Sequence, residues 1–266
     1  MNILIIGASS FIGAYQVEQL INTPDFVGGV VGTGRNPRFR DYYESIGVPY
    51  YNIDVCDYDS FKVLNQYDFD AAVLFATMMP SNIPKDDDSD DTAEYYKVNV
   101  LGTLNALEYC RTRGINKLIS FGTRFDCRLY DSNTVITEET PLNYSLTDDH
   151  AAFVMSNNAK WDVMRYYNEK YEMNNIYFRI PTIFGVGPHG SFYKDGIYRK
   201  SGIQIFIDKA AAGEPIEVYG STDTTKDLLY ESVIPSTMGF TKQMQNIGQV
   251  TNKGIELSIN GDILRG

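Results

Sequence analysis

Short apolar runs alternate with longer stretches of helical periodicity through roughly the first two thirds of the chain. The runs with the composition of buried strands are Asn2–Ile6, Val27–Val31, Tyr51–Ile53, Ala71–Phe75, Lys117–Phe121 and Ile176–Arg179. The helical stretches between them are Phe11–Ile21, Phe61–Gln66, Ala93–Arg113 and Ala151–Glu172. This alternation is typical of βαβ units, whose right-handed crossovers build a parallel sheet. We therefore predict an α/β fold with a doubly wound parallel sheet.

The pattern changes beyond Pro181 to segments rich in Gly, Pro and Tyr, with one helical stretch near Ile203–Ala212. A chain of 266 residues is long enough for one large domain and a smaller lobe. We expect the sheet domain to occupy residues 1–180 and a small lobe to occupy residues 181–266.

Composition and charge exclude several classes of protein. The chain is 43% apolar, which is too apolar for intrinsic disorder, and 23 basic against 34 acidic residues give a net charge of −11. Nucleic-acid binding depends mainly on clustered basic residues, so we expect no such partner. The first apolar run is too short for a signal peptide or a membrane span. Cys56, Cys110 and Cys127 have no metal-ligand or disulfide spacing, so we expect a soluble protein of the reducing cytoplasm.

One run of charge, Asp86–Asp91, directly precedes the predicted third helix. Its carboxylates favour a helix N-terminus, and Asp91 and Glu94 have the spacing of a capping box. A hard cation would need ligands at defined spacing around a turn glycine, which this run lacks. We interpret it as a solvated loop rather than a metal site.

A glycine-rich turn, Gly7 to Gly13, follows the first predicted strand and opens a helix. In this context the first glycine permits the tight turn, the last permits close packing of helix on strand, and the helix N-terminus meets a pyrophosphate. Ser10 stands where a middle glycine is expected. We predict that Gly7, Ser10, Phe11, Ile12 and Gly13 bind a dinucleotide.

The end of the second predicted strand, Gly32–Asn36, contains no acidic residue to bind the ribose hydroxyls of NAD. Arg35 could instead pair with a 2′-phosphate, which favours NADP over NAD, although an ordinary surface arginine is the alternative. After the third strand, Asp54 and Val55 are placed to meet the adenine. The alternative for Asp54 is a carboxylate that caps a turn.

Further motifs follow in order along the chain: Asp70–Ala76, Asn99–Thr103 with the form N-x-x-G-T, Leu118–Thr123, Ala159–Lys160, Arg179–Pro188 and Ala212–Gly220. With Gly7–Gly13 they resemble the extended short-chain dehydrogenase/reductase family, over essentially the whole chain. That family comprises NAD(P)-dependent sugar-nucleotide epimerases, dehydratases and reductases. The resemblance implies a Rossmann-type sheet, a cofactor site that includes Ala76, and a nucleotide-sugar substrate.

The resemblance also implies catalytic positions. Thr123 matches the hydroxyl that polarises the substrate oxygen, and Lys160 matches the lysine that holds the ribose and lowers the pKa of a tyrosine four residues earlier. Ser156 stands in place of that tyrosine. An alkyl hydroxyl is a far weaker acid than a phenol, so Ser156 cannot simply take over proton transfer. The substitutes near this segment are Tyr144, Asp149, His150 and Cys127, and His150 has the most suitable intrinsic pKa.

The later motifs depart from the family in ways that narrow the chemistry. Arg124 and Phe125 follow Thr123 where 4,6-dehydratases carry an acidic pair, so we do not expect a dehydratase. Lys226 replaces the arginine that meets the substrate diphosphate, and Arg199 is a second candidate for this contact. Val233 replaces the final aspartate of that motif, and the chain stops soon afterwards, so the lobe is short by nature or by truncation.

Two functions remain open. The first is an epimerase or reductase that transfers hydride at a ring carbon bearing a hydroxyl, with Thr123, Ser156 and Lys160 at the catalytic positions. The second is a sensor or pseudo-enzyme that binds NAD(P) with little or no catalysis, because the tyrosine is absent. The resemblance also implies a homodimer, paired through the two long helices Ala93–Arg113 and Ala151–Glu172.

Overall fold

In the computed structural model, the backbone contacts of the chain divide it into two compact units. The first unit contains Met1–Ile180 and Gly187–Lys200, and the second contains Pro181–Val186 and Ser201–Gly266. The structure describes residues 1–37, 39–80, 92–131, 133–148, 150–180, 183, 191–194, 197–200, 202–216, 225–233 and 242–251.

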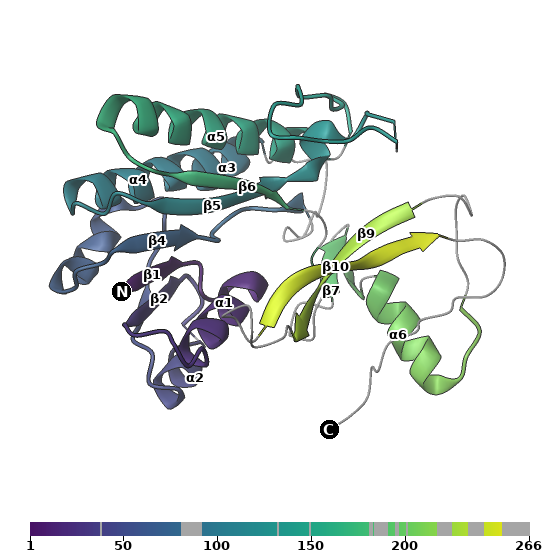
Figure 1. Ribbon diagram of the computed structural model, residues 1–266, viewed down its shortest axis with the longest axis horizontal. Helices are drawn as coiled ribbons and strands as arrows, with labels where there is room; N and C mark the ends of the chain where they lie inside the picture. Colours follow the sequence, from purple (N-terminus) through teal and green to yellow (C-terminus); the bar gives the residue numbers. More distant parts are fainter. Residues whose placement is uncertain are drawn as a thin grey trace. The chain divides into compact units, whose positions relative to one another are not determined.

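A six-stranded parallel sheet forms the centre of the first unit (Figure 1). Its strands, in spatial order, are β3 (Tyr50–Asn52), β2 (Val30–Gly34), β1 (Ile3–Ile6), β4 (Ala71–Leu74), β5 (Leu118–Thr123) and β6 (Ile176–Ile180). The order reverses between β1 and β4, which is the arrangement of a doubly wound dinucleotide-binding fold. The predicted fold class is confirmed.

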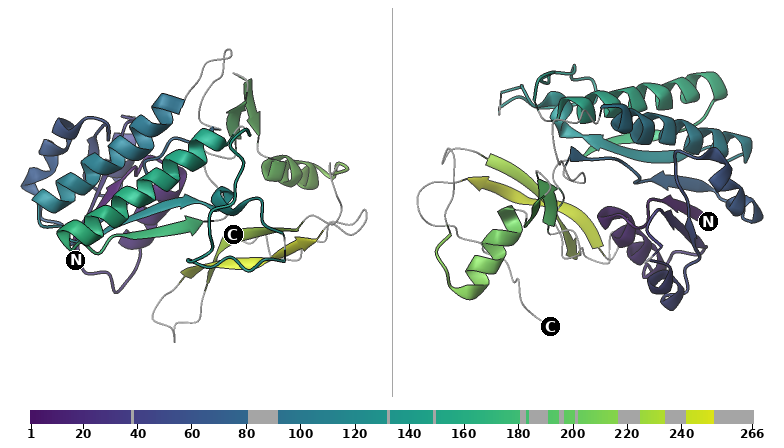
Figure 2. Two further views of the ribbon diagram at one scale, coloured as in Figure 1. Left: turned by 90° about the horizontal axis from the view of Figure 1, so that it is seen from above. Right: turned by 180° about the vertical axis from the view of Figure 1, so that it is seen from behind.

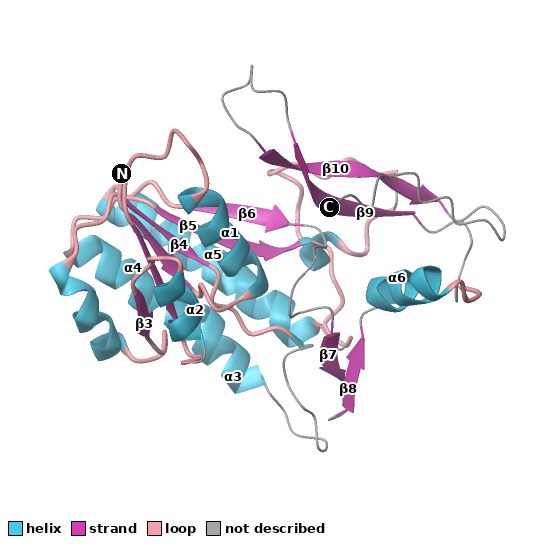
Figure 3. Ribbon diagram, turned by 90° about the horizontal axis from the view of Figure 1, so that it is seen from below, coloured by secondary structure: helices cyan, strands magenta, loops and turns pink. Residues whose placement is uncertain are grey.

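Helices cover both faces of this sheet (Figures 1 and 2). Alternate residues of β1 point to opposite faces: Ile3 and Ile5 join one hydrophobic cluster, and Leu4 and Ile6 join the other. The first cluster includes residues of α1 (Phe11–Ile21) and α2 (Phe39–Ser45), and the second includes residues of α4 (Gly102–Thr112) and α5 (Ala151–Tyr171). Strands β1 and β2 are buried along their whole length, and all six strands point their carboxyl ends to one edge of the sheet (Figure 3).

Several predicted elements have different bounds in the structure. The predicted strand from Val27 is wrong in its first half, because β2 begins at Val30 and the Val27 side chain is 83% exposed. Gly28 lies so close to the backbone of Met1 that a Cβ there would be 1.7 Å from Met1 O, so the chain approaches the sheet by a tight crossing. The short helix before Gln66 is a 3₁₀ helix, η1 (Tyr58–Gln66).

The long predicted third helix is interrupted by a π-helical turn. It consists of α3 (Thr92–Tyr96), the π turn η3 (Lys97–Leu101) and α4. Such turns concentrate at functional sites. Helix α2 was not predicted, because Tyr43 is its single buried residue and gives no periodic signal.

None of the four strands that the structure describes after β6 was predicted from the sequence. The first unit includes the antiparallel hairpin of β7 (Ser191–Lys194) and β8 (Ile197–Lys200). The second unit contains α6 (Gly202–Ala212), as predicted, and an antiparallel pair of β9 (Thr225–Val233) and β10 (Lys242–Thr251). The acidic run Asp86–Asp91 lies outside the described residues.

None of the three cysteines forms a disulfide. Among the helices that the structure describes, none is both long and apolar enough to cross a membrane. The described residues contain no group of three or more His, Cys, Asp and Glu side chains that could hold a metal ion.

Candidate functional site

The glycine-rich turn after β1 lies at the point where the strand order reverses. Gly7 has a φ of +92°, and a Cβ there would lie 2.5 Å from the backbone nitrogen of Ala76, which follows β4. A Cβ on Gly13 would lie 2.3 Å from Gly7 O. Both positions therefore need glycine, the first for its backbone conformation and both for close approach.

Ser10 is compatible with this turn because its side chain caps α1. Its hydroxyl oxygen accepts a hydrogen bond from Gly13 N at 3.1 Å, and its own backbone N–H donates to Gly7 O at 2.9 Å. Phe11 and Ile12 begin the helix directly after this cap. The turn and the positive end of the α1 dipole thus form the kind of N-terminus that binds anions.

Side chains of β3 donate hydrogen bonds to the backbone carbonyl groups at the end of β2 and in the loop after it. Tyr50 donates its hydroxyl hydrogen to Asn36 O at 3.0 Å. With its amide turned to donate, Asn52 lies 2.8 Å from Gly34 O and 2.9 Å from Arg35 O. The side chain of Arg35 is exposed.

The two residues predicted to meet adenine lie after β3. Asp54 is exposed and accepts a hydrogen bond from Cys56 N at 3.0 Å, which is the geometry of a turn cap. Val55 is buried, and a Cβ on Gly102 of α4 would come within 2.7 Å of its side chain. Val55 therefore packs between the strand end and the helix.

Thr123 and Lys160 come together near the carboxyl end of β5. Thr123 is buried, and its hydroxyl oxygen accepts a hydrogen bond from Phe125 N at 3.1 Å, capping the short helix η4 (Arg124–Cys127). Lys160 is 1% exposed and donates from Nζ to Phe121 O at 3.1 Å. Burial lowers the pKa of Lys160 to about 7.

The lysine ammonium has spare hydrogen-bonding capacity. An ammonium group carries three N–H donors, and Phe121 O is its one acceptor among the described residues. No carboxylate contributes to its pKa shift. A ligand with hydroxyl oxygens would satisfy the remaining donors.

The hydroxyl of Ser156 is already engaged on both sides. It donates to Phe153 O at 2.9 Å and accepts from Asn99 Nδ2 at 2.9 Å, and the side chain is fully buried. Asn99, in the π turn, also accepts from Met78 N at 2.7 Å and from the Thr77 hydroxyl at 3.0 Å. Ser156 therefore links α5 to the π turn and to the loop after β4.

Three of the four side chains considered as substitutes for the tyrosine pack against other groups. The His150 ring stacks on Phe125 with centroids 4.5 Å apart. The thiol of Cys127 lies 3.8 Å from Pro141 O, and burial raises its pKa. Tyr144 packs against a small hydrophobic cluster of Tyr95, Phe153 and Val154, and Asp149 lies outside the described residues.

A buried ion pair beside this site was not predicted. Arg179 Nε lies 2.8 Å from an oxygen of Asp126, which is 2% exposed, and Arg179 also donates to Thr137 O at 3.2 Å. Burial raises the pKa of Asp126, against the opposing effect of Arg179. In the sequence, Arg179 is recognisable only as the first residue of the motif Arg179–Pro188. A carboxylate three residues after Thr123 was the available signal for its partner.

Arg199 and Lys226 lie in β8 and β9, and their side chains are outside what the structure describes. The predicted substrate contacts therefore stay predictions.

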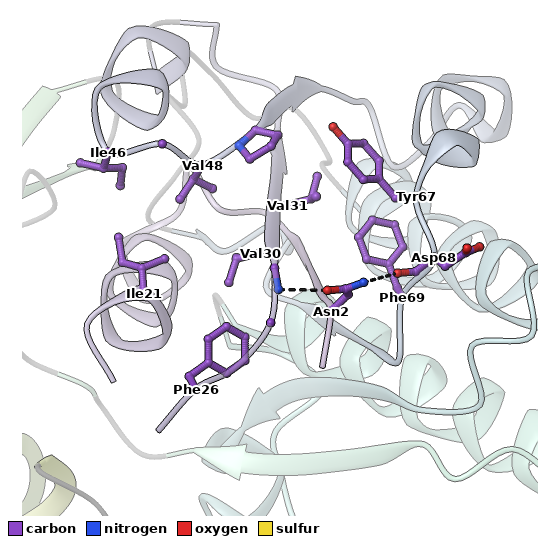
Figure 4. Close-up of a pocket in the computed structure, with 14 residues that line it drawn as sticks. Asn2, Ile21, Phe26, Val30, Val31, Ile46, Val48, Tyr67, Asp68 and Phe69 are labelled. Carbon is purple, nitrogen blue, oxygen red and sulfur yellow. Dashed lines mark hydrogen bonds between the residues drawn. The ribbon is translucent and has the colours of Figure 1, made fainter. Parts of the chain in front are cut away.

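A separate cavity of about 370 Å³ opens at the amino ends of the strands (Figure 4). Its walls include Ile21, Phe26, Val48 and Phe69. The amide of Asn2 is held by the backbone, accepting from Gly29 N and donating to Asp68 O, both at 3.0 Å. None of the predicted site residues whose side chains the structure describes lines this cavity, and the glycine-rich turn, Thr123 and Lys160 lie at the opposite edge of the sheet.

Relatives of known function match most of the chain. It is 23% identical to a UDP-glucose 4-epimerase of Caenorhabditis elegans over 97% of this chain and 77% of that protein. It is 24% identical to a dTDP-glucose 4,6-dehydratase of Haemophilus influenzae, over 93% of this chain and 74% of that protein.

Solved structures share the fold. A UDP-glucose 4-epimerase from Thermotoga maritima, solved with UDP-glucose, aligns with a TM-score of 0.67 at 18% identity, covering 86% of this chain and 69% of that one. The Thermus thermophilus UDP-glucose 4-epimerase, solved with NAD, aligns with a TM-score of 0.65 at 20% identity, covering 86% and 70%.

The family model described as NAD dependent epimerase/dehydratase family matches residues 3–232. This range includes the glycine-rich turn, the end of β5 and the helix that carries Lys160. The chain therefore belongs to the NAD-dependent epimerase/dehydratase family.

Proposed function

We propose that this chain is an NAD(P)-dependent epimerase or reductase of nucleotide sugars. The observation that carries the proposal is the pairing of the Gly7–Gly13 turn with a buried Lys160 at the same edge of the sheet. The relatives named as UDP-glucose 4-epimerases support the substrate class.

The described residues fit the cofactor. The turn and the α1 N-terminus would bind the pyrophosphate, and the two free N–H donors of Lys160 would bind ribose hydroxyls. NAD(P), when bound, supplies reversible hydride transfer. Thr123 has its oxygen occupied by Phe125 N, which leaves its O–H free to donate to a substrate oxygen.

The second candidate is a protein that binds the cofactor with little catalysis. The observation that favours it is the engaged hydroxyl of Ser156, which is fully buried and held by Asn99 and Phe153. This hydroxyl is not presented to a substrate, so position 156 contributes no proton transfer.

Cofactor preference rests on Arg35. Solved relatives contain NAD, whereas the exposed guanidinium and the absence of an acidic residue after β2 suit a 2′-phosphate. We infer that both cofactors bind and that Arg35 favours NADP. Arg35→Ala should then weaken NADPH binding and leave NADH binding unchanged.

The test is a fluorescence titration of the purified protein with NADH and NADPH. Lys160→Ala should weaken binding of both about tenfold, the size of one or two lost hydrogen bonds. Lys170→Ala, on an exposed position of the same helix, is the matched control. Binding equal to that of wild type in Lys160→Ala would exclude the proposed ribose contact.

Turnover separates the two candidates. The protein with bound cofactor is incubated with UDP-glucose or UDP-galactose, and the products are separated by chromatography. Interconversion supports the enzyme, and tight cofactor binding without conversion of these or other nucleotide sugars supports the binding protein. Absence of any cofactor binding would contradict both.

A further inference from the structure

Tyr43 is a fully buried tyrosine on the short helix α2, next to the glycine-rich turn. Its exposed fraction is 0%, and it is the one buried residue of that helix. Its hydroxyl donates to Ala8 O at 2.6 Å, in a buried hydrogen bond that spans 35 positions of sequence. The second helix of the fold is therefore tied directly to the turn.

This bond completes the fixation of Ala8. The backbone N–H of Ala8 donates to Thr33 O at 2.7 Å, and its carbonyl accepts from Tyr43. Ala8 itself is fully buried. Both polar backbone groups of this residue thus have partners on the protein side of the turn.

The orientation of the next peptide follows from planarity. In a trans peptide the C=O and the N–H point in opposite directions. Because Ala8 O points to Tyr43, the N–H of Ser9 in the same peptide points away from Tyr43. Tyr43 thereby fixes the direction of a backbone donor that lies between Gly7 and the start of α1.

Tyr43 is itself held in place. Its ring stacks on Tyr50 with centroids 5.1 Å apart and an interplanar angle of 10°. Tyr50 donates to Asn36 O, two residues after the end of β2. The two stacked tyrosines therefore connect the glycine-rich turn to the loop after β2. Stacking on Tyr50 restricts the Tyr43 ring and so holds its hydroxyl near Ala8 O.

We propose that Tyr43 is a positioning residue for the diphosphate of the dinucleotide, acting by holding the Ala8–Ser9 peptide with the Ser9 N–H directed to the ligand. The inference rests on the proposed cofactor binding. Tyr43 touches no ligand in this arrangement. It sets in advance a donor that would otherwise have to be ordered when the ligand binds.

Tyr43→Phe removes only the hydroxyl, and its effect should depend on the ligand. We expect NADH and ADP to bind about tenfold more weakly, because the Ser9 N–H is no longer held in line with the phosphate. A tenfold loss is the usual effect of one hydrogen bond to an anion. Adenosine, which lacks phosphate, should lose less than twofold. Affinities for ADP and adenosine are measured by displacement of NADH fluorescence.

Tyr109→Phe is the matched control. The Tyr109 hydroxyl is buried in α4, on the other face of the sheet from α2, so its removal should leave every affinity unchanged. Thermal unfolding of both variants accompanies the titrations. A loss for adenosine as large as that for ADP would show a general effect on the unit and overturn the proposal.

A measurement on the wild-type protein covers the case in which Tyr43→Phe does not fold. Amide hydrogen exchange at Ser9 should slow on addition of ADP but not of adenosine. Unchanged exchange overturns the proposal, as does a folded Tyr43→Phe variant that binds ADP like wild type. If the wild-type protein binds neither NADH nor NADPH, the proposed function fails as well, which distinguishes the two failures.

Discussion

Burial of the Lys160 ammonium destabilises the fold unless other groups replace its lost hydration. The described residues offer one carbonyl, Phe121 O, and no carboxylate takes part in the pKa shift. A side chain that costs stability in the free protein is typical of a binding or catalytic position. The cost should be visible in the dependence of stability on pH.

Lys160→Met is expected to stabilise the ligand-free protein. The pKa of Lys160 is about 7 in the folded state, below about 10.4 in the unfolded chain. Between these values the unfolded chain binds more protons, so wild-type stability rises with pH in this window, and the full penalty applies below pH 7. At pH 6 the variant should gain about 2 kcal/mol in free energy of unfolding.

Urea unfolding of both proteins at pH 6 and pH 9 measures this difference. The gain of the variant should shrink as the pH rises, because the wild-type lysine deprotonates. A constant difference across this range would contradict a depressed lysine pKa. Lys170→Met, at an exposed position, should show no such dependence.

Restoring a tyrosine at position 156 should not restore proton transfer. Ser156 is fully buried, and its hydroxyl accepts from Asn99. A tyrosine ring would exceed the available volume and would remove the bond to Asn99. We expect Ser156→Tyr to destabilise the protein by about 1–3 kcal/mol, the usual cost of overpacking, with no gain in turnover.

Turnover with UDP-glucose and urea unfolding test this variant together. Glu169→Tyr, exposed on the same helix, controls for the effect of adding an aromatic ring. A stable Ser156→Tyr protein with increased turnover would show that the network around Asn99 adapts to the ring.

At the scale of elements, an ion pair between Asp126 and Arg179 connects the segment after β5 to β6. Arg179 of β6 binds the Asp126 carboxylate in η4 and the carbonyl of Thr137 in the following loop. Asp126 also accepts a hydrogen bond at its backbone oxygen from Asn143 N, at 2.8 Å. This pair therefore closes a loop that begins directly after Thr123.

Arg179→Met should destabilise the protein by about 3–5 kcal/mol, because it leaves a buried carboxylate uncompensated. Arg165→Met, which breaks an exposed pair with Asp162, should cost less than about 1 kcal/mol. Burial raises the pKa of Asp126 above its unfolded value, so its ionisation destabilises the fold as pH rises through the folded pKa. The cost of Arg179→Met should therefore shrink in acid.

Urea unfolding at pH 4 and pH 7 compares the two variants. Equal costs for Arg179→Met and Arg165→Met would show that Asp126 is hydrated in the folded protein. A cost that grows in acid would contradict the assigned direction of the pKa shift.

Short apolar runs were sufficient to locate the central strands because β1 and β4 are almost entirely buried. α1 has the predicted bounds Phe11–Ile21, and α5 ends one residue before the predicted end. The predicted start of β2 was wrong because Val27 is apolar yet exposed. The hydrophobic pattern alone does not show where pairing with β1 begins. The π turn was not predicted, because its apolar residues continue the hydrophobic pattern of the flanking helices.

The candidate site was only partly readable from the sequence. Gly7 and Gly13 could be recognised because only glycine fits the tight turn and the close backbone contacts at these positions. The roles of Tyr43 and Asn99 depend on contacts across 35 and 57 positions, and no local pattern specifies such partners. Lys160 was identified by its motif, but its isolation from carboxylates required the structure.

At the scale of the whole molecule, the predicted homodimer is open to test. The helices expected to pair carry exposed apolar side chains, with Leu101 of η3 42% exposed and Tyr166 of α5 50% exposed. Isolated exposed apolar residues are ordinary on monomers. The net charge of −11 on each chain opposes association of two copies.

If the helices pair, association should strengthen with salt, because screening weakens the repulsion between like-charged chains. Sedimentation at about 0.05 M and 0.5 M salt measures it. Tyr166→Glu should shift the protein to monomer, since it places a further negative charge in the interface. Val27→Glu adds the same charge at an exposed position in a loop and should leave the dimer intact. A monomer at both salt concentrations would remove the dimer, whereas a dimer insensitive to Tyr166→Glu would place the interface on another surface.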